Sequence, residues 1–314
     1  MKKKIYQFHG WLGLNFGLVL FIICLSGTFA TISHEIDWLC NPAIRVTPSE
    51  DHASWATMVA VAEEYADDAA VRYCRAPLGT RFAAEFWTKD SRGNTRRIYV
   101  DPYRGKATGE ATWMNSQRFF RDFHRRFYVT AGWGIWLVSA FAFVLSSASI
   151  TGLMFYARWW TRLFVLRSRL GFRMFFSDLH RLFGLWTLIF SLIISATGLW
   201  YLIEKAATSK YQEIRRAAEE NSSVDESSFQ RRKPQITPDG PKLSIDVLVD
   251  NAQAEMPGLK VKSISMSIGE KQAVRVSGQA TAWLVRNRTN WVSLDPYTGR
   301  VLEMEKAEDL SAFE

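Results

Sequence analysis

The sequence has few of the residues and none of the short motifs that carry most soluble enzyme chemistry. Only 3 cysteines and 5 histidines occur in 314 residues. There is no Cys-x-x-Cys-His, so nothing supports covalent attachment of a c-type haem. There is also no Walker A loop, no G-x-S-x-G, no H-E-x-x-H and no G-x-G-x-x-G. The chain alone therefore gives no support for nucleotide, flavin or protease chemistry.

Charged residues are missing from three long segments. Trp11–Ile32, Ala131–Tyr156 and Leu182–Ile203 contain no Asp, Glu, Lys or Arg, and each reaches the roughly 20 residues that a membrane-spanning helix needs. Signal peptides have a shorter apolar core of about 7–15 residues, so we expect the first segment to remain as an anchor. The sequence predicts three membrane spans.

Positive charge is concentrated beside these segments. The chain begins with "MKKK", and the loop "RWWTRLFVLRSRLGFR" after the second span holds five arginines and no acidic residue. Short basic flanks face the cytoplasm, so we expect the N-terminus and this loop to be cytoplasmic. The net charge of +8 is then a topology signal, and we do not expect nucleic-acid binding.

Two similar polar units lie outside the spans. The first contains "RRIYVDPYRGKATGE" at 96–110 and the second "NWVSLDPYTGRVLEM" at 290–304. Each has a strand pattern, Asp-Pro-Tyr and a glycine turn, which indicates a hairpin. Helical patterns precede both, at 54–69 and 244–256. We interpret this as an internal duplication that gives two small α+β domains.

These patterns predict a membrane α-helical bundle of three spans with two external α+β domains. The expected parts are a first transmembrane helix at 1–37, a first external domain at 38–118, a second transmembrane helix at 119–160, a cytoplasmic Arg-rich loop at 161–176, a third transmembrane helix at 177–204, a polar linker at 205–242 and a second external domain at 243–314.

Four of the five histidines lie at span ends. With this topology His9 and His180 share the cytoplasmic side, and His34 and His124 share the outer side. His9 and His34 are 25 residues apart, nearly seven helical turns, which predicts one face of one helix and a separation of about 37 Å. Glycines repeat at offsets of 4 and 18 after two of the histidines: Gly13 and Gly27 follow His9, and Gly184 and Gly198 follow His180.

Paired imidazoles from two helices are a standard axial arrangement for haem iron, and nearby glycines leave room for a porphyrin. We therefore expect two haem b groups, with the iron of one bound by His9 and His180 and that of the other by His34 and His124. Interfacial anchoring of the histidines and ordinary helix packing of the glycines remain alternatives. Cys40 and Cys74 fall in one external domain, and whether they form a disulfide stays open.

Several motifs together resemble those of a known family. "FHGWLGL", "GTFATISHEIDWLCNP", "DFHRRF", "DLHRLFG" and the two Asp-Pro-Tyr units resemble the PepSY-associated transmembrane proteins, which include inner-membrane siderophore reductases of the FoxB type. The resemblance implies PepSY-like periplasmic domains in a bacterial inner-membrane oxidoreductase. Such a protein passes electrons from a cytoplasmic-side donor to a periplasmic ferric siderophore and releases Fe(II).

Many relatives carry a further span after the second PepSY domain, whereas this sequence ends at Glu314. That difference leaves a homo-oligomer open. Two other functions also stay open. The protein could be a membrane-anchored PepSY module, without haem, that binds peptides or regulates a peptidase, or it could be a component of a transporter.

Overall fold

The computed structural model describes residues 2–67, 69–90, 92–129, 132–156, 159–167, 171–221, 236, 238–267, 269–282 and 285–309. The chain divides into two compact units. One unit is helical and comprises residues 1–33 and 117–225, and the other contains a β-sheet and comprises residues 34–116 and 226–314. Part of the expected 205–242 linker, at 222–235 and 237, lies outside the described residues.

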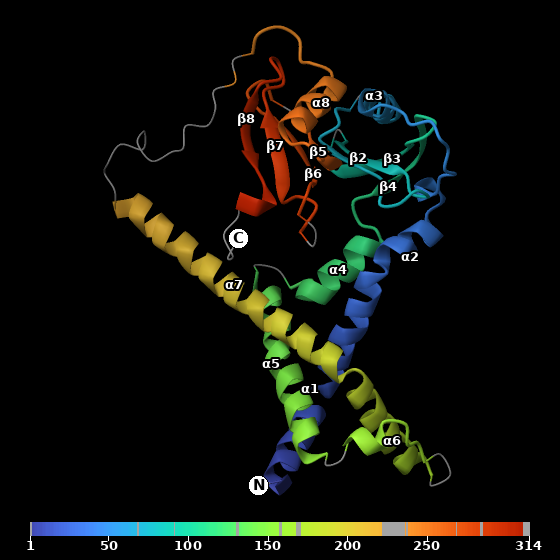
Figure 1. Ribbon diagram of the computed structural model, residues 1–314, viewed down its shortest axis with the longest axis vertical. Helices are drawn as coiled ribbons and strands as arrows, with labels where there is room; N and C mark the ends of the chain where they lie inside the picture. The colour runs from blue at the N-terminus through green and yellow to red at the C-terminus, as the bar shows by residue number, and fades with distance from the viewer. Residues whose placement is uncertain are drawn as a thin grey trace. The chain divides into compact units, whose positions relative to one another are not determined.

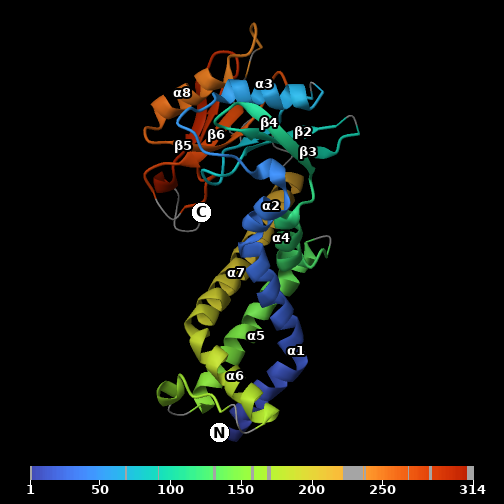
Figure 2. The ribbon, with the colours of Figure 1, turned by 90° about the vertical axis from the view of Figure 1, so that its right-hand side faces the viewer.

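The helical unit contains all three candidate membrane spans (Figure 1). They lie at Lys2–Thr31, Trp133–Met154 and Leu188–Lys210, which confirms a membrane protein with three apolar helices of spanning length. Helix α5 contacts both α1 and α7, and the views in Figures 1 and 2 show it beside each of them. The helices are α1 (Lys2–Thr31), α4 (Ser116–Arg126), α5 (Trp133–Phe155), η2 (Trp159–Arg162), α6 (Phe172–Trp186) and α7 (Leu188–Asn221).

Each expected transmembrane helix is interrupted at one end. Helix α1 ends at Thr31, where the Ser33 hydroxyl donates to the Ala30 carbonyl, and α2 (Ser33–Cys40) begins after a bend. Phe127 and Tyr128 have positive φ angles of 49° and 56°, which stop α4 before α5 starts. Helix α6 ends at Trp186 and α7 begins at Leu188, and the Thr187 between them still donates its backbone N–H to the Phe183 carbonyl.

These breaks correct three expectations about the spans. His34 is not on the same helix as His9, so the predicted shared face and the 37 Å spacing do not apply. His124 and His180 lie on the short helices α4 and α6, which precede the spans rather than open them. Helix α7 continues to Asn221, so the segment expected to be linker from residue 205 begins as helix.

The sheet unit contains two copies of one motif, a helix followed by four strands. The first copy has α3 (Trp55–Tyr65), β1 (Tyr73–Arg75), β2 (Ala84–Lys89), β3 (Thr95–Asp101) and β4 (Lys106–Thr112). The second has α8 (Ile245–Glu255), β5 (Lys260–Ser265), β6 (Val274–Gln279), β7 (Asn290–Leu294) and β8 (Val301–Glu305). Short helices η1 (Pro42–Ile44) and η4 (Ala307–Asp309) flank them.

The two Asp-Pro-Tyr turns have the same hydrogen bonds. The Asp101 carboxylate accepts from the backbone N–H groups of Tyr103 and Arg104. The Asp295 carboxylate accepts in the same way from those of Tyr297 and Thr298. Gly105 and Gly299 follow with φ angles of 61° and 71°, which favour glycine. The proline carbonyl of each turn also accepts a backbone N–H from just before the helix of the same copy: Pro102 from Ala53, and Pro296 from Leu243. The repeated sequence is therefore a repeated structural unit.

The two copies form one sheet, which corrects the expectation of two separate α+β domains. The strand order is β4-β3-β2-β1-β5-β6-β7-β8, and every described pairing is antiparallel. Strand β1 pairs with β5, with Cys74 opposite Ile264. Each copy alone would leave this strand with unpaired backbone groups, and joining the copies satisfies both edges.

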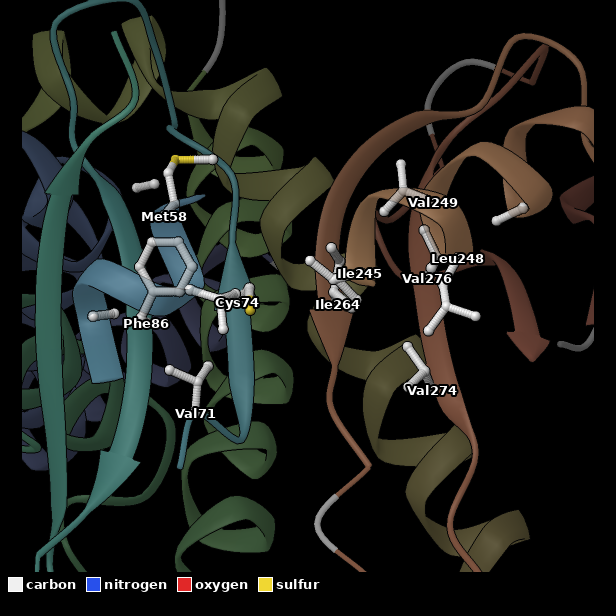
Figure 3. Close-up of a cluster of buried hydrophobic side chains, with 14 of the residues drawn as sticks. Met58, Val71, Cys74, Phe86, Ile245, Leu248, Val249, Ile264, Val274 and Val276 are labelled. Atoms are coloured by element: carbon white, nitrogen blue, oxygen red, sulfur yellow. The ribbon is translucent and has the colours of Figure 1, made fainter. Parts of the chain in front are cut away.

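Helices α3 and α8 cover the same face of this sheet (Figures 1 and 2). They enclose one apolar cluster that draws on both copies. Figure 3 shows Met58, Cys74 and Phe86 from the first copy and Leu248, Ile264 and Val276 from the second. The shared core explains why residues 34–116 and 226–314 form a single unit.

The three cysteines are free thiols, so Cys40 and Cys74 are not joined. Cys40 is exposed at the end of α2, whereas Cys74 is completely buried in the apolar cluster. Burial raises the pKa of the Cys74 thiol well above its usual range, and the Glu63 carboxylate raises it further.

Candidate functional site

The helical unit brings His9 and His180 together. Their ring centres are 6.2 Å apart, with the planes at 61°. His9 comes from α1 and His180 from α6, so two helices that are distant in sequence supply the pair. An imidazole nitrogen binds a metal at about 2 Å and the ring centre lies about 1 Å further, so two axial imidazoles on one metal have centres roughly 6 Å apart.

Helix α5 fixes the orientation of His9. The His9 Nδ1 lies 3.1 Å from the Ala148 carbonyl and 3.2 Å from the Thr151 hydroxyl. A carbonyl oxygen only accepts, and the Thr151 hydroxyl donates to the Ser147 carbonyl, so Nδ1 carries the proton. The lone pair of the neutral ring is then on Nε2, the nitrogen that can ligate a metal.

His124 is held in the same way by α1. Its Nδ1 lies 3.0 Å from the Ile23 carbonyl and 3.2 Å from the Ser26 hydroxyl, which itself donates to that carbonyl. The proton is therefore on Nδ1 here too. Burial lowers the pKa of His124, against the opposing effect of the Ile23 bond, so the neutral ring is favoured.

The two anchored histidines lie far apart along α1. His9 is on its second turn, and His124 contacts the stretch from Ile23 to Gly27. That is 14 to 18 residues further along, about 21–27 Å at 1.5 Å per residue. The helical unit thus has two histidine sites near opposite ends of its first helix.

His34 belongs to the sheet unit, where the structure places it beside a small cavity with both polar and apolar lining residues. The cavity has a volume of about 30 Å³ and is also lined by Asp37, Arg75, Glu85 and Arg97. Glu85 accepts from Arg75 at 3.0 Å and from Arg97 at 2.9 Å. A cavity of this size that contains charged side chains has room for a water molecule. His34 and His124 lie in different units, so the expected outer pair rests on the sequence.

The four expected glycines have different surroundings. A Cβ on Gly27 would lie 2.9 Å from Cε1 of His124, and a Cβ on Gly198 would lie 2.9 Å from the Ala142 side chain on α5. Gly27 therefore allows His124 to approach α1, and Gly198 allows α7 to approach α5. A Cβ on Gly13 or Gly184 would meet no atom within 4 Å.

Five residues that shape these sites were not singled out by sequence reasoning: Ile23, Ser26, Ala148, Thr151 and Gly152. A Cβ on Gly152 would lie 3.2 Å from Cε1 of His9. One signal was available for Thr151 and Gly152, because "SITGLMFY" at the end of the second span matches "SATGLWYL" in the third. Ser26 and Ala148 had no signal, because a hydroxyl or a carbonyl in an apolar helix becomes informative only when its partner is known.

The His9–His180 site offers two imidazoles as possible metal ligands. Within the described residues, no group of three or more His, Cys, Asp or Glu side chains could hold a metal. Two imidazoles supply two ligands, and a porphyrin supplies the four in-plane nitrogens that haem iron needs. If haem were bound here, His9 and His180 would be the two protein ligands of its iron.

The fold and these sites define a class: a membrane protein with three apolar helices, paired histidines and an antiparallel sheet unit. The family model for the PepSY-associated TM region matches residues 6–286. The chain therefore belongs to the PepSY-associated transmembrane family. None of the curated proteins matches it.

Proposed function

We propose that this protein is a di-haem b electron-transfer protein of the bacterial inner membrane that reduces a periplasmic ferric siderophore and releases Fe(II). One observation carries the proposal. His9 and His124 each have Nδ1 bound by a backbone carbonyl and a hydroxyl of a neighbouring helix. Metal-bound histidines are usually held in this way, because the second hydrogen bond fixes the tautomer and the ring orientation.

In this proposal His9 and His180 would hold the iron of the inner haem, and His34 and His124 would hold that of the outer haem. When bound, haem supplies one-electron redox chemistry at its iron. The chain's own residues hold the imidazoles: Ala148 and Thr151 keep the proton on Nδ1 of His9, and Ile23 and Ser26 do so for His124. Each Fe(III) takes one electron, which a cytoplasmic-side reductant supplies.

The proposed orientation puts the N-terminus in the cytoplasm and the sheet unit and C-terminus in the periplasm. It is supported by Lys2, Lys3 and Lys4 at the N-terminal end of the first span and by the arginines that follow the second. The His9–His180 site then lies on the side of the electron donor, and His124 lies toward the side of the acceptor.

Haem content tests the proposal directly. We expect two haems per chain by pyridine haemochrome. We also expect His9→Ala or His180→Ala to remove one haem, and His34→Ala or His124→Ala to remove the other. His52→Ala is the matched control, because His52 is exposed and lies against Tyr103, in the sheet unit. This variant should keep both haems.

Two results would contradict the proposal. Colourless wild-type protein would end the haem assignment and favour the peptide-binding PepSY module. Reduced protein in proteoliposomes that is reoxidised by quinones but by no ferric siderophore would leave electron transfer in place and remove the iron assignment.

A further inference from the structure

Two short helices of the helical unit carry the same four-residue pattern before a span. In α4 it is Asp122-Phe-His124-Arg, and in α6 it is Asp178-Leu-His180-Arg. Each aspartate is two residues before a histidine of the proposed sites. The two aspartates have different hydrogen-bond partners, and this difference indicates a role for Asp178.

Asp122 forms ion pairs within its own helix. Its carboxylate lies 2.7 Å from the Arg126 guanidinium and 3.6 Å from that of Arg118. Both partners are four residues away and partly exposed. Pairs of this kind contribute little to stability and join no second element.

Asp178 instead binds a separate segment of chain. Its carboxylate accepts from the backbone N–H of Arg167 at 3.1 Å, and from Nε and Nη2 of the same arginine at 2.8 Å each. The Arg181 guanidinium also contacts it. Asp178 is only 2% exposed, and a buried carboxylate with a two-pronged arginine and a backbone donor is a strong, geometrically specific contact.

A second hydrogen bond ties the same segment to α6 two turns away. The Trp186 indole N–H donates to the Leu163 carbonyl at 2.8 Å. Residues 163–167 thus lie along α6 between Asp178 and Trp186, and we call them the 163–167 segment. This stretch of α6 carries His180.

We propose that Asp178 is a positioning residue, which holds α6 against the 163–167 segment so that His180 faces His9. His9 is fixed by α5, and the distance to its partner then depends on the placement of α6. Replacing Asp178 with Asn would remove the charge that pairs Arg167 and leave that guanidinium without its carboxylate. The proposal concerns the protein fold, and only its consequence for haem rests on the proposed function.

Hydrogen exchange on the full-length protein tests the contact without reference to haem. In Asp178→Asn we expect the Arg167 backbone amide to exchange about 10- to 100-fold faster, because the acceptor loses its charge and the arginine that closes over it loses its ion pair. Asp122→Asn is the matched control and should leave that amide unchanged. Unchanged protection of Arg167 in Asp178→Asn would overturn the proposal.

The position of α6 can be measured by pulsed electron resonance between two spin labels. Leu14→Cys on α1 and Phe176→Cys on α6 are suitable sites, because both side chains are exposed, with Cys24 and Cys40 replaced by Ser. We expect a narrow distance distribution in the parent protein and in Asp122→Asn, and a broad or shifted one in Asp178→Asn. An identical distribution in all three would contradict a positioning role.

Haem spectra add the link to the proposed function. In a protein with two haems, Asp178→Asn should weaken or change the low-spin signal of one haem, and Asp122→Asn should change neither. Absence of haem from the wild type would remove the proposed function, while the exchange and distance measurements would still decide the role of Asp178. Intact low-spin signals from both haems in Asp178→Asn would contradict that role.

Discussion

At the scale of single residues, each anchored histidine depends on a neighbour without a side chain. The His124 ring lies against Gly27, and the His9 ring lies against Gly152. A methyl group in either place would push on an imidazole that two hydrogen bonds hold in position. Membrane helices commonly use small residues for close approach, and here the approaching group is a ring that can bind metal.

Gly27→Ala should therefore displace His124, because the new Cβ would lie 2.9 Å from Cε1 of the ring. We expect a loss of about 1–3 kcal/mol in stability from overpacking, together with loss of one haem from the proposed pair. Thermal unfolding in detergent and the haem spectrum would measure these effects. Gly17→Ala on the same helix is the control, since nothing lies within 4 Å of its Cβ position. Equal effects of the two changes would contradict the packing argument.

At the scale of elements, the structure joins two repeats through one core. Helix α8 belongs to the second copy, yet the side chain of Leu248 packs in a cluster that includes Phe86 and Ile98 of the first. A substitution that destabilises one copy should therefore also destabilise the other. If the copies were independent domains, the loss of stability would stay in the copy that carries the substitution.

Leu248→Ala tests this coupling. Leu248 is 2% exposed, and we expect a loss of about 2–5 kcal/mol, with faster hydrogen exchange in β2 and β3 as well as in β6 and β7. Val247→Ala on the same helix is the control, because Val247 is 42% exposed and the change should be nearly neutral. Exchange that accelerates only in β6 and β7 would show that the copies unfold separately.

At the scale of the whole molecule, the proposed orientation predicts which thiols an impermeant reagent can reach. Cys40 is exposed in the sheet unit and should be labelled in intact spheroplasts, whereas Cys74 is buried and should not react. A cysteine introduced as Ser177→Cys on α6 should be labelled only after permeabilisation. Labelling of Ser177→Cys in intact cells, with Cys40 protected, would reverse the orientation.

Patterns that are local in sequence predicted much of this molecule. Apolar runs located the three membrane helices, and the Asp-Pro-Tyr repeats correspond to the turns before Gly105 and Gly299. The pairing of β1 with β5 could not be predicted, because Tyr73–Arg75 is a three-residue strand whose partner lies about 190 residues away. The break before α5 was also missed, since nothing in "RRFYV" marks Phe127 and Tyr128 as left-handed.

The candidate site divides in the same way. The expected membrane topology was enough to pair His9 with His180, because it put both on the cytoplasmic side. In the structure their ring centres are 6.2 Å apart. The hydrogen bonds that the Ala148 and Ile23 carbonyls accept from the two histidines had no sequence signal. Every residue has a carbonyl group, and only tertiary packing selects the one that meets a histidine. The Asp178–Arg167 contact could not be predicted for a related reason. The basic loop contains five arginines, and only the folded structure shows which of them pairs with Asp178.

The pairing of β1 with β5 also sets the order of events during synthesis. Cys74 leaves the ribosome about 190 residues before its partner Ile264, and translation at about 5–20 residues per second makes that delay roughly 10–40 s. During this interval the second and third apolar helices are made, while β1 presents an open strand edge to any other chain nearby. The sheet unit can close only after the membrane helices have been synthesised, so its assembly is late and depends on protection of that edge until β5 arrives.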